Sequence, residues 1–495
     1  MEHAATHKIY VRPIMKPVPW VNNAYQEQTP EDSLLVDKIH IAVRRLFEET
    51  AGRVAPSIKV INLSIGLGYR QFDRSMSPLA SLLDWLSFKY RVLFVVSAGN
   101  HSDSIDVGMS FSNFAIADKS IRDKAIISYT NNESRNLRLL SPAESINALS
   151  IGSTFEDASA FVENSRQILP CSDGLPSASS SIGMGMNNAV KPDILFPGGR
   201  NCIREIIRNG INGTVVDWQN SPTREPGTTS AAPSGKVMYT FGTSNSAALI
   251  SHEASRCYDT LLEVFSLAEK DIPDDHLALL IKAMLVHGAE WGELSQKYAE
   301  VMNLYKKGTT QLSRQDCSQK LPRFLGYGKP NINRAIECAK NRVTLIGYGD
   351  LKSGEAITYD LPLPFDFSSA KICRRLTATL TWFSPTVSTR QKYRAAQCWF
   401  NIENSKKNLL DARVDVDWQA AVRGTVQHEI FENENTVVWD EDGAIQIKVN
   451  CRADADEKFA GLVPYALMVS FEMKSAIDID VYAKVAQRVS AKVSI

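Results

Sequence analysis

Apolar residues in the first half of the chain alternate between short continuous runs and stretches with helical spacing. The runs are VINLSIG (60–66), RVLFVVSAGN (91–100), SINALSIGS (145–153) and KPDILFPGG (191–199). Apolar runs that end in small residues are typical of strands buried on both faces. Apolar stripes at three- and four-residue steps predict helices over 33–50, 79–88, 246–265 and about 275–288. This alternation of strands and helices predicts an α/β fold with a mostly parallel sheet.

Two further features belong to this half. The segment KIYVRPIM (8–15) is short and apolar, and we expect it to be another strand. Residues 157–190 and 199–240 are rich in Gly, Ser, Pro and Asn, which predicts long loops. Long loops inside an α/β domain usually carry function or are disordered.

From about residue 350 the apolar period changes to two. The alternating segments are RRLTATLTWF (374–383), AIQIKVNC (444–451), YALMVSF (465–471) and IDIDVYAKV (477–485). Strict alternation predicts antiparallel strands with one buried face, and several such strands predict a C-terminal β-sandwich. We therefore predict two domains, residues 1–349 and residues 350–495, with the boundary near 347–354.

Composition narrows the class of protein. The chain has 495 residues, with 55 Lys and Arg against 55 Asp and Glu, so it lacks the basic field of nucleic-acid binders. It contains no apolar run long enough to span a membrane, and the N-terminal MEHAATHKIYVRP lacks the apolar core of a signal peptide. None of the eight cysteines lies in a C-x-x-C pair, which favours reduced thiols in a cytosolic protein. A structural zinc site is improbable on this spacing, and we expect no metal or cofactor.

Ser244, in GTSNSAALI (242–250), has two interpretations from the residues alone. Ser is a preferred N-cap residue, because its hydroxyl accepts a hydrogen bond from a free N–H of the first turn. The other interpretation makes Ser244 a nucleophile at the positive end of a helix dipole. The helical stripe that follows it fits both, so other parts of the chain must decide.

Four segments in order resemble the core motifs of the subtilases, the subtilisin-like serine peptidases. They are VINLSIG, VVSAGN, KPDILFPGG and GTSNSAALI; SPAESINALSIGS (141–153) and LPRFLGYGKPNINRAI (321–336) add weaker matches. The resemblance covers about residues 8–345 and implies a three-layer fold and a serine endopeptidase. The C-terminal domain is similar to the sandwich appended to several subtilases. KIYVRPIMKP together with GTSNSAALI resembles subtilisin-like proteins encoded beside AAA ATPases in bacterial plasmid-maintenance and defence operons. This implies a protein or peptide substrate and an AAA ATPase partner.

The resemblance assigns a short set of site residues. Ser244 matches the nucleophile, and Asn100 matches the side-chain donor of the oxyanion hole, with the Ser244 N–H as second donor. Residues matched to substrate binding are Ser64, Ile65 and Gly66, as a strand edge that pairs with the substrate, and Ser97, Ala98 and Gly99, as a wall of the P1 pocket. Taken alone, Asn100 also fits a turn residue after a strand. The family's Pro after the nucleophile is replaced by Ala248, and a small residue by Ser246.

A general base is missing from this set. The family's H-G-T and D-x-G motifs, which carry the catalytic His and Asp, have no counterpart in the sequence. His252 is eight residues beyond Ser244, about 12 Å along a helix, and cannot reach its hydroxyl. His101 adjoins Asn100 but lies opposite the usual base position. Because a serine hydroxyl needs a base, we expect the chain as given to be inactive.

The missing motifs also affect the expected sheet. In the family, the strand bearing the Asp lies between the strands matched by KIYVRPIM and VINLSIG, so we expect a slot with unpaired backbone groups. Either the chain is the C-terminal piece of a longer peptidase, which we favour, or another polypeptide or a rearrangement closes the slot. The alternative function is a non-catalytic pseudopeptidase or interaction module. An α/β-hydrolase esterase is excluded because no G-x-S-x-G surrounds Ser244.

Overall fold

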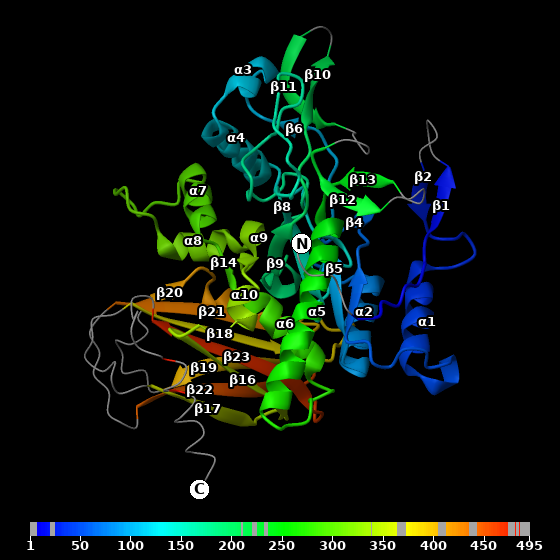
Figure 1. The fold of residues 1–495 in the computed structure, drawn as a ribbon, viewed down its shortest axis with the longest axis vertical. Helices are drawn as coiled ribbons and strands as arrows, with labels where there is room; N and C mark the ends of the chain where they lie inside the picture. The colour runs from blue at the N-terminus through cyan, green and yellow to red at the C-terminus, as the bar shows by residue number, and fades with distance from the viewer. Residues whose placement is uncertain are drawn as a thin grey trace.

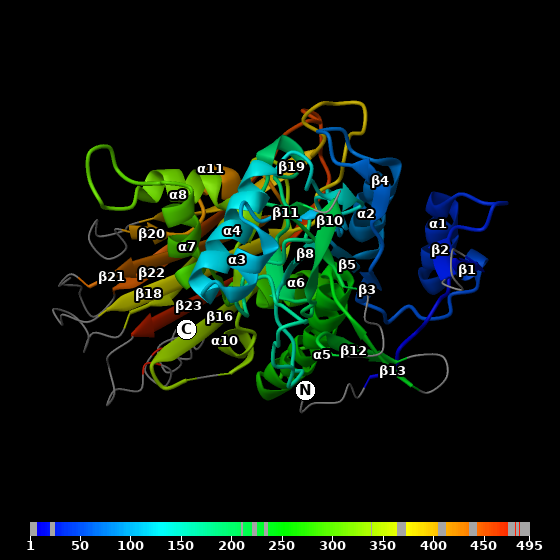
Figure 2. The same ribbon diagram turned by 90° about the horizontal axis from the view of Figure 1, so that it is seen from above.

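The computed structural model has two parts, helices around a parallel sheet and an antiparallel C-terminal part beside them (Figure 1). Seen from above, α1 and the C-terminal sheets lie on opposite sides of the central helix α5 (Figure 2). The residues that the structure describes are 7–19, 25–208, 211–219, 225–231, 236–337, 339–363, 373–403, 412–434, 443–473, 481 and 485.

A four-stranded parallel sheet forms the centre of the first part. Its strands, in spatial order, are β3 (Val60–Leu63), β5 (Leu93–Ser97), β8 (Leu149–Thr154) and β9 (Ile194–Pro197). Every neighbouring pair is parallel. β5 and β8 are buried along their whole length, as strands covered on both faces must be. The four apolar runs of the sequence thus become the four strands, and the predicted fold class is confirmed.

Helices cover both faces of this sheet. On one face, α1 (Leu35–Phe47) and α2 (Pro78–Tyr90) share a core with Phe94 and Val96 of β5. On the other face, α5 (Thr243–Leu267) and α6 (Leu277–His287) share a core with Leu93 and Val95. Successive side chains of a strand point to opposite faces, so β5 serves both layers. The four predicted helices are confirmed with small changes at their ends. Among the described residues, no helix combines the length and apolar character that crossing a bilayer requires.

The sheet ends differently from the prediction at its β3 edge. KIYVRPIM is irregular, and its Ile9 and Val11 side chains are 78% and 75% exposed. His7, just before it, bonds Asp259 Oδ1 of α5 at 2.6 Å, and Ile14 and Met15 at its end pack against the core of α1 and α2. The strand prediction was wrong because the apolar run has no neighbouring strand to pair with. The expected slot is absent too: within the described part of the chain, the sheet simply ends at β3.

The predicted loop over 199–240 is also wrong in part. It contains β10 (Ile203–Arg208), β11 (Ile211–Trp218), β12 (Thr228–Ala231) and β13 (Val237–Thr240). β10 and β11 form a sheet with β6 (Ile105–Asp106), and β12 and β13 form a hairpin. The β-branched residues of these strands outweigh the Gly and Pro content around them. Residues 157–190, in contrast, are a loop as predicted, apart from one short turn of helix at Met186–Asn188.

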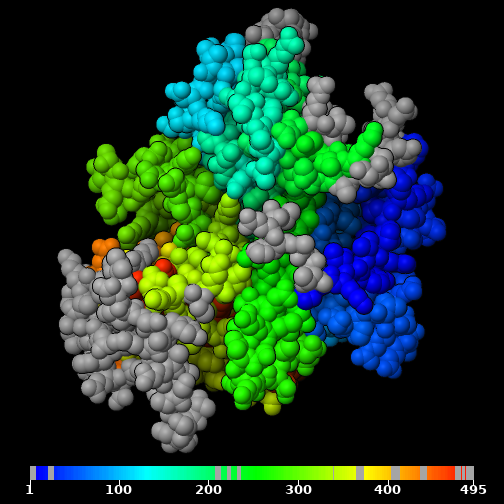
Figure 3. Space-filling model, in the orientation of Figure 1, coloured from blue at the N-terminus to red at the C-terminus, as the bar shows by residue number. Residues whose placement is uncertain are grey.

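Short elements complete the first part. They are β1 (Lys16–Pro19), β2 (Tyr25–Gln28), β4 (Leu67–Gln71), α3 (Phe111–Ile116), α4 (Lys119–Asn132), β7 (Leu140–Ser141), β14 (Ala289–Glu290), α7 (Glu293–Val301), α8 (Arg314–Lys320), α9 (Pro322–Leu325), β15 (Lys329–Pro330) and α10 (Asn333–Ile336). In the space-filling view, the green surface of α5 lies between the blue N-terminal segment and the yellow-green segment that leads into the C-terminal sheets (Figure 3).

The C-terminal part is a sandwich of two antiparallel sheets. In spatial order, the larger sheet contains β16 (Arg342–Leu351), β23 (Val463–Met473), β18 (Arg374–Trp382), β21 (Val426–Asn433) and β20 (Ala412–Val414), and the smaller one contains β17 (Ala356–Pro362), β22 (Ala444–Ala453) and β19 (Ala396–Glu403). Both sheets contribute apolar side chains to one core, including Leu376, Trp382 and Ile447. The segment IDIDVYAKV lies almost entirely outside the described residues.

The sandwich is packed tightly against α6. Met468 and Ala466 of β23 belong to the same core as α6 and the parallel sheet, and Thr381 donates a hydrogen bond to Leu279 O at 2.9 Å. The short helix α11 (Trp418–Ala421) also lies at this interface. The predicted domain boundary after residue 349 falls within β16, and the division into two domains stays a prediction.

A chain of hydrogen bonds crosses this interface through two buried histidines. His428 Nε2 bonds Ala289 O at 3.0 Å and Nδ1 bonds Thr379 Oγ1 at 2.8 Å. Thr379 Oγ1 also bonds His287 Nδ1 at 2.9 Å, and His287 Nε2 bonds Ser470 Oγ at 2.6 Å. A carbonyl only accepts, so Nε2 of His428 is the donor there, and each later bond then has one direction when both rings are neutral. Burial lowers the pKa of both imidazoles, that of His428 to about 4.

Candidate functional site

The residue that caps the N-terminus of α5, Gly242, has a backbone conformation that favours glycine. Gly242 has φ of +124°, and a Cβ there would lie 2.8 Å from Asn100 Oδ1. Gly242 is the N-cap residue of α5, and Ser244 is the second residue inside the helix. The interpretation of Ser244 as the helix cap is therefore wrong. Its side chain lies, half-buried, in the first turn, where the helix dipole is positive.

Asn100 lies against this first turn, at the end of β5. Its Oδ1 accepts hydrogen bonds from Thr243 N at 2.9 Å and Thr243 Oγ1 at 3.2 Å. Thr243 Oγ1 in turn accepts from Gly99 N at 3.2 Å. Since Oδ1 faces the donors, Nδ2 points elsewhere, and it has no hydrogen-bond partner among the described residues. The Asn100 carboxamide is thus fixed beside Ser244 with its N–H groups available.

Ser64, Ile65 and Gly66 follow β3 and approach the same point. Ser64 Oγ donates to Ser244 O at 3.2 Å. A Cβ placed on Gly66 would lie 3.4 Å from Gly99 Cα, so the two segments are in contact. Three of the predicted segments therefore meet at the beginning of α5. Their roles in binding a substrate stay predictions.

Ser97, Ala98 and Gly99 are buried, and the main chain of Ala98 and Gly99 is already bonded within the protein. Ala98 N donates to Ile151 O at 2.9 Å, and Ala98 O accepts from Leu140 N at 3.0 Å. Gly99 O accepts from Ser181 N at 2.9 Å. At Gly99, φ is +108° and an added Cβ would lie 2.5 Å from Leu140 Cγ. These three residues therefore lie inside the fold just before Asn100, and their role as a wall of the P1 pocket stays a prediction.

Two residues of this arrangement escaped the sequence analysis. Thr243 is fully buried and links Asn100 to Gly99. The available signal was its position between Gly242 and Ser244, because a Thr hydroxyl there can bond neighbouring segments. Leu140, which packs against Gly66 and Gly99, lies 40 residues after Asn100, and no local pattern indicated it.

No histidine among the described residues forms a hydrogen bond with the Ser244 hydroxyl. His101 Nε2 bonds Arg138 O at 2.9 Å, and His276 bonds Asp350 at 2.9 Å. His252 lies beside Glu253, further along α5, and His40 stacks edge-on against Trp85. His3 lies outside the described residues. Within the described part of the chain, Ser244 and Asn100 therefore lie side by side with no histidine bonded to the Ser244 hydroxyl, and their catalytic roles stay predictions.

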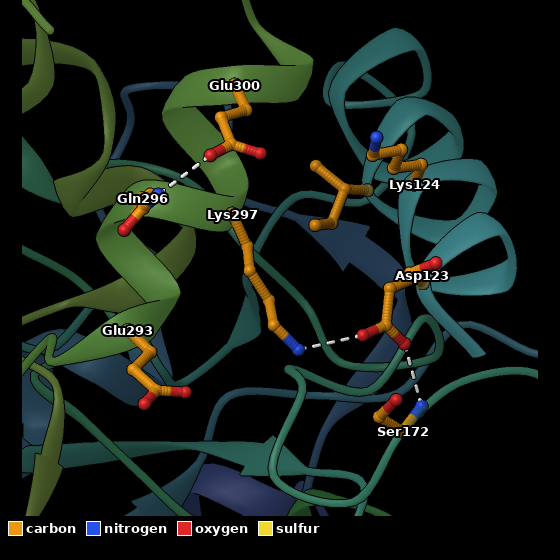
Figure 4. A pocket seen from close by; sticks show the side chains of 9 residues that line it. Asp123, Lys124, Ser172, Glu293, Gln296, Lys297 and Glu300 are labelled. Atoms are coloured by element: carbon orange, nitrogen blue, oxygen red, sulfur yellow. Dashed lines mark hydrogen bonds and ion pairs between the residues drawn. The ribbon is translucent and has the colours of Figure 1, made fainter.

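A separate cavity of about 530 Å³ lies between α4 and α7 (Figure 4). Lys297 Nζ donates to Asp123 Oδ2 at 2.8 Å, and the other oxygen of Asp123 accepts from Ser172 N at 2.8 Å. Gln296 donates to Glu300 at 2.9 Å on the α7 side. None of the predicted site residues lines this cavity. Its central charges, those of Asp123 and Lys297, satisfy one another, so the candidate site remains at α5.

The fold and the convergence at α5 define a protein of the subtilisin-like class. The sequence profile of the subtilase family matches residues 31–328, more than half of the chain. The chain belongs to the subtilase family, and the sequence-based recognition is confirmed.

Individual relatives are more distant. An uncharacterised protein, y4bN of Sinorhizobium fredii (strain NBRC 101917 / NGR234), is 23% identical over 359 residues, which cover 71% of this chain and 72% of that protein. Among solved structures, the prenylagaramide maturation protease PagA is 17% identical, with a TM-score of 0.32 over 62% of this chain and 69% of that one. The A-subunit of the AB5 toxin from E. coli is 14% identical, with a TM-score of 0.28 over 61% and 65%. Similarities this low say nothing about individual site residues.

Proposed function

We propose that this subtilase is a serine endopeptidase that cleaves peptide bonds through an acyl intermediate on Ser244. The supporting observation is the position of Asn100, whose carboxamide is held at the first turn of α5 by Thr243 while its Nδ2 keeps no partner among the described residues. The Ser244 N–H belongs to the first four of the helix, which lack intrahelical acceptors. Two donors without a partner among the described residues therefore belong to groups at the first turn of α5, beside Ser244.

The chemistry that these groups offer is acyl transfer. When Ser244 Oγ attacks a peptide carbonyl, the negative charge moves to the carbonyl oxygen. In this proposal Asn100 Nδ2 and the Ser244 N–H donate to that oxygen, because fixed donors stabilise the charge that develops there. The proton of Ser244 needs an acceptor, and the described residues place none within hydrogen-bond distance. We therefore propose that the chain by itself does not turn over, and that casein cleavage by it is undetectable.

A fluorophosphonate probe tests this proposal, because it phosphonylates an activated serine. The chain alone should label very slowly, and added imidazole, which acts as an external base, should restore labelling of Ser244 in proportion to its concentration. Fusion of an upstream segment that carries Asp and His should do the same. Ser251→Ala, on the same helix, is the matched control and should label like the wild type. Absence of Ser244 labelling under all three conditions would contradict the proposal.

The second candidate is a non-catalytic module that binds a polypeptide at the same place. It is favoured by the absence of a bonded base on Ser244 within the described residues. This function predicts peptide binding that Ser244→Ala leaves intact and that imidazole never converts into covalent labelling. An AAA ATPase partner rests on the sequence resemblance alone; co-purification with the product of a neighbouring ATPase gene would test it.

A further inference from the structure

Two cysteines face each other in the smaller sheet of the sandwich, away from Ser244. Cys398 of β19 and Cys451 of β22 are direct partners in the antiparallel register. β19 and β22 are neighbours in the C-terminal part (Figure 1). Both side chains are buried in the sandwich core, Cys398 completely and Cys451 to within 2%. Both are present as free thiols.

The main-chain hydrogen bonds of Cys451 show whether the two cysteines form a hydrogen-bonded or a non-hydrogen-bonded pair of the antiparallel ladder. Cys451 N donates to Glu355 O at 3.0 Å, and Cys451 O accepts from Gly354 N at 2.9 Å. Glu355 and Gly354 lie just before β17, on the side of β22 opposite β19. Because the N–H and C=O of one strand residue point to the same side, Cys451 sends no main-chain bond toward Cys398.

The opposite strand shows the same alternation. Ala396 N donates to Ser384 Oγ at 3.3 Å and Phe400 N to Gln427 Oε1 at 2.8 Å, so both point away from β22. Cys398 lies midway between them and shares their direction. Cys398 and Cys451 are therefore a non-hydrogen-bonded pair, whose Cα atoms are typically about 4.5 Å apart. This separation lies within the range of about 4.4–6.8 Å that a disulfide spans.

The two thiols differ in acidity. Burial raises the pKa of Cys398 well above its usual value. The hydrogen bond from the Cys398 thiol lowers the pKa of Cys451. Cys451 is thus the side chain that more readily forms a thiolate, and Cys398 is in contact with it to complete a second step.

We propose that Cys398 and Cys451 form a redox-responsive site, at which a hydroperoxide such as hydrogen peroxide converts the two thiols into a cross-strand disulfide. The Cys451 thiolate attacks one peroxide oxygen, the O–O bond breaks, and a sulfenic acid and hydroxide form. The Cys398 sulfur then attacks the sulfenic sulfur, and its proton leaves with the hydroxyl as water. In total, two thiols and one hydrogen peroxide give one disulfide and two waters.

The test treats the folded full chain with hydrogen peroxide at a concentration that leaves its circular dichroism unchanged. Mass spectrometry should then find a peptide pair joined through Cys398 and Cys451, which dithiothreitol separates. Cys257→Ala, which removes a buried thiol of α5, is the matched control and should cross-link like the wild type. In Cys398→Ser, whose hydroxyl keeps a hydrogen-bond donor for Cys451 but cannot form a disulfide, dimedone should trap a sulfenic acid at Cys451 that does not accumulate in the wild type.

Three results would overturn this site. One is that both thiols stay free while other cysteines of the folded chain are oxidised. Another is that the two residues reach sulfinic or sulfonic acid without a cross-link. The third is that dimedone traps nothing at Cys451 in the folded Cys398→Ser variant. Each readout is independent of Ser244, so the redox site and the peptidase proposal succeed or fail separately.

Discussion

The first turn of α5 and the end of α6 use their polar groups in opposite ways. At α6, both ring nitrogens of His287 and of His428 are engaged in one directed chain of hydrogen bonds. At α5, Asn100 Oδ1 accepts hydrogen bonds from Thr243, whereas Asn100 Nδ2 has no hydrogen-bond partner among the described residues. Both places combine hydroxyls with amide or imidazole groups near a helix end.

This difference distinguishes a structural polar cluster from one that keeps donors available to a ligand. A buried polar group without a partner costs free energy, so a fold satisfies such groups wherever they only hold elements together. Donors that remain without a partner at a helix N-terminus are available to a ligand. His287 and His428 therefore hold the sandwich on α6, and the presence of histidines in the chain says little about where its chemistry occurs.

The largest expected effect separates these two places completely. Ser244→Ala should abolish imidazole-dependent fluorophosphonate labelling, and it should change the free energy of unfolding by less than about 0.5 kcal/mol, as substitutions away from packed features do. His287→Ala should do the reverse, because it removes a buried ring together with its hydrogen bonds to Thr379 and Ser470. Labelling and urea unfolding of both variants measure this. Loss of labelling in a stable, folded His287→Ala variant would erase the distinction.

The next effect concerns the free donor. Removing one oxyanion-hole donor from subtilisin, a member of this family, slows it by about 10²–10³-fold, and Asn100→Ala should slow rescued labelling similarly. Asn100→Asp keeps the oxygen that Thr243 bonds but replaces the donor with negative charge, so it should label no faster than the alanine variant. Labelling rates at fixed imidazole give the comparison. Wild-type rates in Asn100→Asp would show that Nδ2 does not contact the reacting oxygen.

Much of the fold followed from local patterns, and the failures have physical causes. The apolar runs predict the four parallel strands, because a strand buried on both faces is apolar throughout. The apolar stripes predict the helices, because a helix buried on one face repeats apolar residues at three- and four-residue steps. The strand predicted for KIYVRPIM is absent because an apolar run indicates only that side chains can be buried. A strand also needs a neighbouring strand to pair with. The strands within 199–240 were not predicted because Gly and Pro in this segment indicate a loop, whereas the β-branched residues of β10 and β11 favour strands.

The site followed from the sequence only where its residues lie in short motifs. Ser244, Asn100 and Gly66 were each indicated by their own segment, and the structure brings these segments together. Thr243 and Leu140 act through contacts between segments, which no single segment encodes. The helix-cap interpretation of Ser244 failed because α5 begins at Thr243 and its N-cap residue is Gly242.

The two buried histidines at the α6 interface should make the free energy of unfolding depend on pH. The pKa of His428 falls from 6.5 to about 4 on folding because of burial, and that of His287 is lowered as well. The unfolded chain then binds more protons below pH 6.5, so stability should fall as pH decreases from 6.5 toward 4. One pKa unit corresponds to about 1.4 kcal/mol, which gives about 3 kcal/mol for His428 over this window.

Urea unfolding at several pH values measures that slope. His428→Gln keeps an N–H for Ala289 O but cannot be protonated, so its stability should depend less on pH than that of the wild type. His40→Gln, beside Trp85 near the surface, is the control and should keep the wild-type slope. Equal slopes in His428→Gln and the wild type would show that the buried ring is not the titrating group.

The smallest effect tests how Asn100 is held. Thr243→Val removes the hydroxyl that donates to Asn100 Oδ1 and accepts from Gly99 N, while the Thr243 N–H bond to Asn100 remains. The lost hydrogen bonds are worth about 1–2 kcal/mol, so rescued labelling of Ser244 should slow by roughly tenfold. Thr243→Ser restores the hydroxyl and should recover the rate. If Thr243→Ser labels slowly and Thr243→Val labels fast, the effect comes from packing and not from the hydroxyl. The Thr243 hydroxyl would then have a purely structural role, like the histidines at the end of α6.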